Sequence, residues 1–485
     1  MANGIIANQV DAAALKVAMA TSAIPVYLGQ APIWQVDDAN WADLAGKTFV
    51  IKSIDDMKEK IGFSMPASGA FSKDQSLSMV AYYHTKVEKI LPIIVIVNKA
   101  AVTPSASPTT EEITFVKGMA SIADPNVVLS SIKLTDGADT DPVIYVKDTD
   151  YTVAYDSAGQ NVIISSATLS TATVEYNTVT PSGIVFSADT YEEIDYIPQN
   201  TGYIPASFSA PLWDKETDSA GNVVMSKLAA IAEEPIDKHY YAQAFGQLES
   251  STRSAALTEK ENFTSAKLKV CWPFVKIGSF IYPLSLVFGA RREIVDKRND
   301  GIPYESASNE VIAIDSLVDK SGNVIRQLEK EADTLNANGI ATMAFMTNMQ
   351  WNTYGVCMSN YSEANRGNIP PNKLNDVAVQ MMDYICNDFE LQFGEIIHKP
   401  MSIRTANDIV EVYGKKLNAY VSQGILIAGT IAFEPSENST ADLADGQFTY
   451  SITETNTPPA KAIIANVTYD SDALDSYFEA MGEEE

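Results

Sequence analysis

A stretch rich in proline, serine, threonine and alanine, residues 101–110, separates two kinds of hydrophobic pattern in this chain of 485 residues. Before it, strands and helices alternate, with strands predicted over 24–32 and 93–97 and helices over 53–61 and 75–88. After it, as far as about residue 188, short strands and turns predominate and helix formers are scarce. We therefore expect a multidomain α/β (α+β) protein with an inserted all-β domain of the sandwich or barrel kind.

The inserted domain is predicted from short runs of strand-forming residues divided by turns. These runs are residues 113–116, 131–134, 143–146, 151–155, 161–165 and 172–176. Asp156-Ser157-Ala158-Gly159 lies between two of them and has the composition of a hairpin turn.

Helices and strands alternate again after residue 189. A strand is predicted over 280–288, a long helix over 323–336, a helix over 405–423 capped by Thr405, and strands over 425–433 and 462–469. The chain then ends in an amphipathic helix that begins at Ser471 and places Leu474, Tyr477, Phe478 and Met481 on one face.

The net charge of −28 argues against two classes of partner. A chain this acidic repels phosphate backbones and anionic lipid heads, and no basic patch interleaved with aromatic residues offsets that field. The longest apolar runs, 90–97 and 425–433, are too short to cross a bilayer. We therefore expect neither nucleic-acid binding nor membrane insertion.

Residues with the pattern of a catalytic or metal site are not found in the sequence. The three histidines, His84, His239 and His398, are far apart and follow no metal-ligand spacing. No G-x-S-x-G or G-x-G-x-x-G motif is present. The three cysteines, Cys271, Cys357 and Cys386, are predicted to be reduced core residues. We expect no catalytic residues, no metal and no cofactor, although an α/β enzyme of unfamiliar type stays open as an alternative. The N-terminus lacks the pattern of an export signal, which disfavours a cell-surface protein.

A series of short motifs then follows one order along the chain. They are residues 4–11, the strand ending in Gly29-Gln30-Ala31-Pro32, residues 91–97, Asp300-Gly301-Ile302-Pro303, residues 306–309, residues 335–340, Trp351-Asn352-Thr353-Tyr354-Gly355, residues 417–424, and residues 459–469. In this order and spacing the chain resembles the contractile tail sheath family of phages and related injection machines. Ala307 stands where the family more often has proline.

The resemblance implies a structural subunit, present in the tail of a virion assembled in the bacterial cytoplasm. Such subunits pair with copies of themselves in six-fold rings, stack helically around an inner tail tube, and meet baseplate and tail-terminator proteins. Contraction of the stack drives the tube through a cell envelope. A headless contractile injection particle is the alternative to a phage tail.

The resemblance also divides the chain into six parts. They are an N-terminal arm (1–22), a first core segment (23–100), the inserted β domain (101–188), a second core segment (189–350), a C-terminal domain (351–459), and a C-terminal strand and helix (460–485). The expected inter-subunit residues are Gly4, Ile5, Ile6 and Val10 at one end and Ile463, Ile464, Val467 and Tyr469 at the other. Strand addition to a neighbour's sheet would pair backbone groups in both chains.

A contact with the inner tube is expected at the helix over 405–423. Arg404, Lys415 and Lys416 are basic residues in a strongly acidic chain. The 100° step of an α-helix places Lys416 within the apolar face, where its ammonium either extends to water or meets an acidic tube surface.

Overall fold

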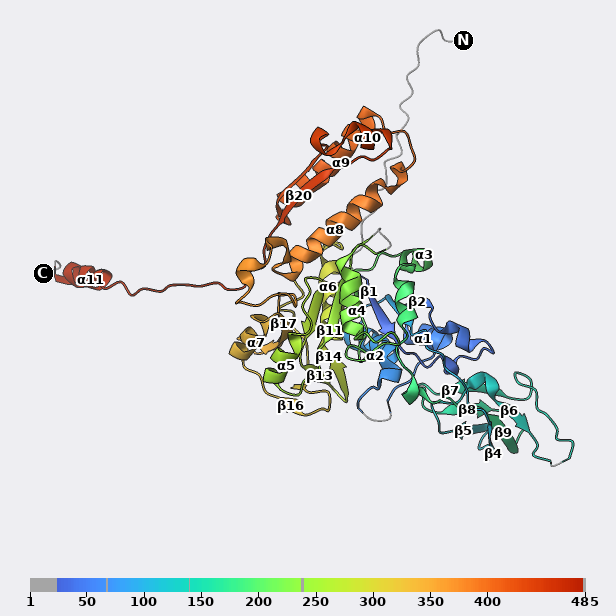
Figure 1. The fold of residues 1–485 in the computed structure, drawn as a ribbon. Helices are drawn as coiled ribbons and strands as arrows, with labels where there is room; N and C mark the ends of the chain where they lie inside the picture. The colour runs from blue at the N-terminus through green and yellow to red at the C-terminus, as the bar shows by residue number, and fades with distance from the viewer. Residues whose placement is uncertain (1–23, 67–68, 139, 237–239, 483–485) are drawn as a thin grey trace, which may run out of the picture.

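A computed structural model describes residues 24–66, 69–138, 140–236 and 240–482 of the chain. The predicted arm residues Gly4, Ile5, Ile6 and Val10 lie outside the described residues. A central α/β domain carries the β insert at one side and the C-terminal domain at another, and the C-terminal tail extends away from all three (Figure 1).

The central sheet has eight strands in the order β18-β17-β12-β11-β10-β1-β3-β2. Its inner strands from β17 to β3 are parallel, and β18 and β2 are antiparallel edges. The strands are β1 Pro25–Gly29, β2 Thr48–Ile51, β3 Ile93–Val97, β10 Ser207–Ser209, β11 Gln243–Gln247, β12 Leu268–Cys271, β17 Ile340–Phe345 and β18 Trp351–Tyr354. Inner parallel strands are covered on both faces, which is why β3 is a continuous run of Ile and Val without polar alternation.

Helices pack against this sheet and bury their apolar sides on it. They are α1 Ile54–Ile61, α2 Ser76–Tyr82, α3 Ile197–Thr201, α4 Val224–Glu233, α5 Arg253–Lys260, α6 Leu284–Arg298 and α7 Glu329–Asn336. The predicted cap of α1 is confirmed, since the Ser53 side chain accepts a hydrogen bond from the Asp56 N–H. The predicted helix over 75–88 is also present, as α2 followed by a π-helical turn, Tyr83–Glu88.

Two predictions in the second core segment are wrong in part. The strand expected over 280–288 ends at Pro283, where β14 (Phe280–Pro283) gives way to α6. The helix expected over 323–336 begins only at Glu329, because Val324 and Ile325 form β16. β14 and β16 are the two edge strands of a four-stranded antiparallel sheet with the order β14-β13-β15-β16. Its inner strands are β13 (Phe274–Ile277) and β15 (Ser316–Val318). β14 and β16 are each the second strand of a hairpin, β13–β14 and β15–β16, and pairing between β13 and β15 joins the two hairpins into one sheet.

The β insert is a sandwich of two three-stranded sheets, β4-β9-β6 and β5-β8-β7, around its own apolar core. The strands are β4 Thr109–Thr114, β5 Met119–Ile122, β6 Lys133–Thr135, β7 Thr152–Tyr155, β8 Val162–Ser165 and β9 Thr171–Tyr176. The strand predicted over 143–146 is wrong, since these residues form a loop with one bridge, Thr135 to Ile144; Val143, Ile144 and Val146 are exposed, and Tyr145 packs on the core of the insert. Its backbone bonds to β6 and the residue after it are limited to the Asp136 N–H donating to the Val143 carbonyl and the Tyr145 N–H donating to the Leu134 carbonyl, on either side of this bridge.

The insert is held on the central domain by directional contacts. The Trp34 indole N–H donates to the Pro125 carbonyl at 2.9 Å, and the Gln35 amide donates to the Gly159 carbonyl at 2.9 Å. The Met65 N–H donates to the Ala158 carbonyl at 2.7 Å. Gly159 has φ +65°, and an added Cβ would lie 1.9 Å from the Phe63 carbonyl oxygen. The predicted turn at 156–159 is therefore also a docking point.

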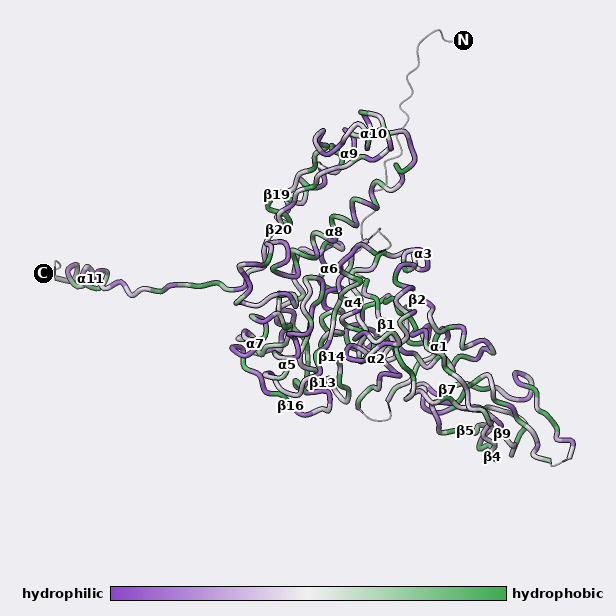
Figure 2. The backbone as a smooth tube through the Cα atoms, in the orientation of Figure 1, coloured by the Kyte–Doolittle hydropathy of each residue, from purple (hydrophilic) through white to green (hydrophobic). Residues whose placement is uncertain are grey.

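The C-terminal domain consists of α8 (Asp376–Phe393), α9 (Ile403–Ser422) and the two-stranded sheet of β19 (Leu426–Ala432) and β20 (Ser451–Asn456), with the short α10 (Thr440–Ala444) in the connection. The last element is α11 (Asp472–Gly482). Figure 2 shows hydrophobic residues along the tail that joins β20 to α11, well away from the body of the molecule.

Candidate assembly surfaces

The C-terminal domain has an apolar core of its own between its two long helices and its sheet. Ile409, Tyr413, Leu417 and Tyr420 on α9 face Met381, Tyr384 and Ile385 on α8, together with Leu426 and Ile431 on β19. The helix predicted over 405–423 is confirmed as α9. Its cap is Ser402 and not Thr405, because the Ser402 side chain accepts a hydrogen bond from the Thr405 N–H.

The neighbouring side of α8 carries a polar stripe that packs on the central domain. Asp376, Gln380, Asp383 and Asn387 follow one another at intervals of three or four residues, so they share one face of the helix. Each is buried, and each has a partner on the central sheet or the segments beside it. We call these four residues the α8 polar stripe. This stripe was not predicted, although its spacing of four, three and four residues is visible in the sequence.

Asp376 makes the most enclosed contact of the α8 polar stripe. Its carboxylate lies 2.6 Å from the Lys269 ammonium on β12, and the two side chains are 1% and 2% exposed. Lys269 also donates to the Gly355 carbonyl at 2.7 Å, and the Ser306 hydroxyl donates to Asp376 at 2.7 Å. Several hydrogen bonds to a buried pair are needed to offset the cost of removing both charges from water.

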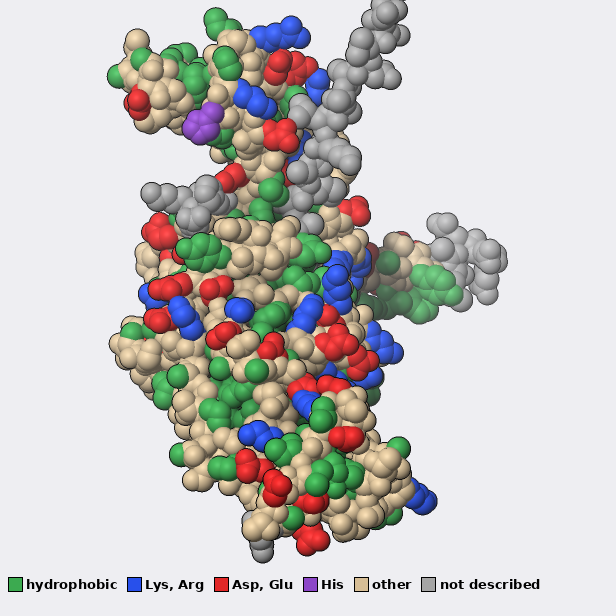
Figure 3. Space-filling view, turned by 90° about the vertical axis from the view of Figure 1, so that its right-hand side faces the viewer, with side chains coloured by type: hydrophobic (Ala, Val, Ile, Leu, Met, Phe, Trp, Pro, Cys, Tyr) green, Lys and Arg blue, Asp and Glu red, His purple; other side chains and the backbone are tan. Residues whose placement is uncertain are grey.

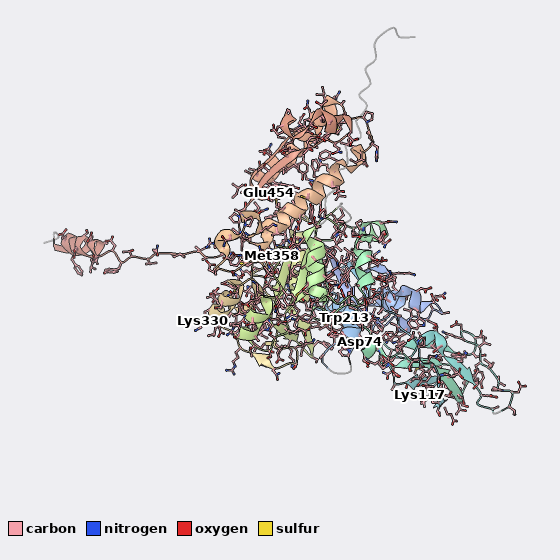
Figure 4. All side chains as sticks on the ribbon, in the orientation of Figure 1. Asp74, Lys117, Trp213, Lys330, Met358 and Glu454 are labelled. Carbon is pink, nitrogen blue, oxygen red and sulfur yellow. The ribbon has the colours of Figure 1, made fainter. Side chains whose placement is uncertain are left out.

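The remaining members of the α8 polar stripe extend this joint along the helix. Asp383 pairs with Lys267, and the pKa of the Asp383 carboxyl is nevertheless raised by burial. Asn387 accepts from the Tyr241 N–H at 2.8 Å and donates to the Tyr241 carbonyl at 2.9 Å. These bonds are directional, so they determine the angle at which α8 leaves the central domain. In Figure 4 the joint lies between Met358 of the central domain and Glu454 on β20.

The three cations expected to contact a tube lie in different environments. Arg404 and Lys415 are exposed, at 91% and 72%, and each pairs with a carboxylate one turn away, Asp408 and Glu411. Lys416 is 15% exposed, and its ammonium lies 2.6 Å from Asp388 on α8, whose side chain is fully buried. The expectation that Lys416 extends to water is therefore wrong, because a carboxylate on the facing helix supplies its counter-ion.

Both edges of the β19–β20 sheet are free of further strands in the described part of the chain, where its two strands pair only with each other. One face packs on α9, and the other exposes Ile427, Ala428 and Thr430. An isolated two-stranded sheet of this kind presents unpaired backbone groups along each edge, which another strand can satisfy.

The tail that leaves this sheet exposes the apolar residues predicted to contact a neighbour. Ile463, Ile464, Val467 and Tyr469 are 92%, 82%, 93% and 76% exposed. The strand predicted over 462–469 is absent from the single chain, because no strand lies beside it to complete the hydrogen bonds. The root of the tail is held at Lys461, whose ammonium lies 4.2 Å from the centre of the Tyr361 ring and 3.3 Å from the Cys357 sulfur.

Two of the three histidines and all three cysteines are among the described residues. No described residues form a group of three or more His, Cys, Asp or Glu side chains suited to a metal ion. His84 is fully buried, bonds the Tyr27 hydroxyl at 2.7 Å, and burial lowers its pKa to about 3. Cys271 and Cys357 are buried as predicted, but Cys386 is exposed on α8, which corrects its assignment to the core. The helices of the described part include none that is both long and apolar enough to span a membrane.

Over nearly its whole length, the chain has a fold similar to that of chains in solved contractile injection systems. The chain superimposes on a chain of the six-fold symmetrised cryo-EM structure of the anti-feeding prophage (AFP) baseplate with a TM-score of 0.56, 13% sequence identity, and coverage of 97% of this chain and 99% of the other. For the PVC sheath complex of an extracellular contractile injection system in the contracted state, the TM-score is 0.56 and the sequence identity is 12%. The match covers 98% of this chain and 99% of the other. For the AFP helical sheath in the contracted state, the TM-score is 0.55 and the sequence identity is 12%, with coverage of 97% of this chain and 99% of the other. No protein-family model and no curated protein matches the sequence. The predicted resemblance is thus confirmed at the level of the fold, across nearly the whole chain.

Proposed function

We propose that this chain is the structural subunit of a contractile sheath. One observation carries the proposal: a chain with the sheath fold combines an open two-stranded sheet with an exposed apolar tail of one strand length. An exposed apolar segment beside a free edge is an aggregation hazard in a monomer, but it forms the joint of a polymer. We assign the tail, residues 462–469, to the free edge of a neighbour's β19–β20 sheet.

The finer features of the proposal rest on the similarity to chains of contractile injection systems, one of them in a six-fold symmetrised structure. Identical subunits that exchange one strand each form closed rings or helical stacks. We place six of them in a ring around an inner tail tube, with the baseplate and tail-terminator proteins at the two ends and contraction as the working step. A virion tail and a free contractile particle both fit this arrangement. The proposal contains no catalytic step.

Removing the tail tests the proposal. A chain that ends after Lys461 keeps the contact of Lys461 with Tyr361, so the subunit should fold as before. It should lose the ability to form sheath-like tubes or rings in negative-stain electron microscopy, because the strand that joins neighbours is gone. A chain that lacks only residues 483–485 is the control and should assemble. Full-length tubes from the shortened chain would exclude the tail as the joint.

We also propose that the exposed face of α9 contacts the inner tube, through Arg404 and Lys415. Each cation is paired only with an exposed carboxylate, and such pairs contribute about 0–1 kcal/mol, so they can exchange for an acidic partner surface. Lys416 is left out of this contact because Asp388 already neutralises it.

The double variant Arg404→Glu with Lys415→Glu should fold normally but form empty or already contracted sheaths when it is coexpressed with its tube protein. Lys330→Glu, an exposed change on α7 of the central domain (Figure 4), is the matched control and should give extended, tube-filled sheaths. Electron microscopy of both preparations measures the fraction of filled tubes. Normal filling with the double variant would exclude α9 as the tube contact.

A further inference from the structure

The terminal helix α11 has an apolar face that nothing in the described part of its own chain covers. Leu474, Tyr477 and Phe478 lie on one side of the helix and are 46%, 62% and 60% exposed. The two rings are in edge contact, with centres 5.6 Å apart. Figure 3 shows green side chains next to the grey end of the chain, apart from the body of the molecule. Two aromatic rings on a free helix represent a large unburied apolar surface.

A pocket with matching chemistry opens at one end of the C-terminal domain. It has a volume of about 720 Å³ and lies between the end of α8, the α8–α9 loop and the residues that lead into β20. Its walls include Phe389, Phe393, Ile397, Met401, Phe448 and Tyr450. Concave apolar sites of several hundred Å³ accept side chains of about the size of one or two aromatic rings.

The register of the β19–β20 sheet connects the tail to this pocket. Ala432 at the end of β19 pairs with Ser451 at the start of β20, so both lie at the pocket end of the sheet. A tail strand that runs antiparallel to β20, or parallel to β19, therefore travels towards the pocket. Residues 462–469 would extend about 26 Å at the usual rise of a strand, which is enough to cover the sheet. The helix that follows would emerge beside the pocket.

We propose that α11 of one subunit docks in this pocket of a neighbouring subunit, with Tyr477 and Phe478 inserted among its aromatic side chains. This inference rests on the proposed function and adds a second contact to the strand joint. The charges of the two segments also favour α11 as the occupant of this pocket. Residues 470–485 contain seven Asp or Glu residues and no Lys or Arg, whereas residues 397–401, which line the pocket, contain His398 and Lys399 and no carboxylate. Asp445 is the acidic residue that lines the pocket.

The arrangement assigns the pocket to a neighbour and not to the same chain. The tail leaves β20 at Asn456, the end of the sheet opposite the pocket, and Lys461 then holds it against Tyr361 of the central domain. Docking in its own pocket would require the tail to release this contact and reverse its direction.

Disulfide trapping between differently tagged full-length chains tests the docking. One chain carries Phe478→Cys and the other Ile397→Cys, and both carry Cys386→Ser because Cys386 is the exposed native thiol. Mild oxidation of mixed polymers should link the two tags, and the same mixture kept dilute and unassembled should not link. A third chain carries both substitutions, and a bond that forms within that chain but never between the two tags would overturn docking in a neighbour. Polymers that form without any linkage would overturn the inference and leave the strand joint intact.

A second measurement uses assembly itself. Phe478→Asp on the apolar face should raise the concentration needed for polymerisation by roughly tenfold to a hundredfold, as expected for the loss of one buried aromatic ring. Ser476→Asp, on the opposite face of α11, adds the same charge and should leave that concentration unchanged. An equal effect of both changes would assign the result to charge and overturn the docking. Failure of the unsubstituted chain to polymerise at all would instead remove the proposed function.

Discussion

Replacing Lys269 with alanine should lower the free energy of unfolding by about 3–5 kcal/mol, the usual cost of leaving one member of a buried ion pair without its partner. Asp376 would then keep a charge that is 1% exposed, with the Ser306 hydroxyl as its remaining side-chain donor. Denaturant unfolding of the unassembled subunit, followed by circular dichroism and tyrosine fluorescence, measures the change.

Two further variants establish that the effect comes from the unpaired charge. Lys269→Met combined with Asp376→Leu removes both charges and should recover most of the stability, because apolar pairs replace buried ion pairs at little cost. Lys320→Ala removes one member of the Lys320–Glu249 pair, in which both side chains retain solvent contact, and should cost less than about 1 kcal/mol. A Lys269→Ala variant as stable as Lys320→Ala would show that the joint does not depend on this pair.

Replacing Lys416 with glutamate should destabilise the C-terminal domain by several kcal/mol, on the order of 3–5, because it places a second carboxylate beside the buried Asp388. The neighbouring change Lys415→Glu should cost less than about 1 kcal/mol, since Lys415 is exposed and pairs only with Glu411. Near-ultraviolet circular dichroism reports the packing of Tyr384, Tyr413 and Tyr420 between the helices and should change in the first variant alone.

Charge reversal provides the control for this second prediction. Lys416→Glu with Asp388→Lys restores an ion pair of opposite orientation between α8 and α9, and should recover a measurable part of the lost stability. If Lys416→Glu costs no more than Lys415→Glu, the Lys416–Asp388 contact does not hold the two helices together.

The separation of stability from assembly matters for any mutational study of this chain. Lys415 and Lys416 are adjacent in sequence and look equivalent there, yet a change at Lys416 would abolish assembly by unfolding the C-terminal domain. A change at Lys415 or Arg404 should preserve the fold, so its effect on assembly measures the role of the exposed surface of α9. Only the exposed pair of cations can therefore test a contact with the tube.

The sequence alone determined those features that depend on neighbours a few residues away. The Ser53 cap of α1, the buried strand β3, the apolar face of α9 and the turn at 156–159 all follow from residues within one or two turns. The change of composition near residue 101 identified the β insert, because strand and helix periodicities differ over any short window. The order of short motifs was enough to indicate the sheath fold.

Only the tertiary structure decided the features that depend on distant partners. β13 and β15 pair although they are far apart in sequence, and this pairing joins the hairpins that contain β14 and β16 into one sheet. Lys416 is neutralised by Asp388, and the α8 polar stripe meets Lys267, Lys269 and Tyr241, none of which is near in sequence. The tail at 462–469 has the pattern of a strand but no partner within its own chain, since hydrogen bonds along a strand require a second backbone that the local sequence cannot supply.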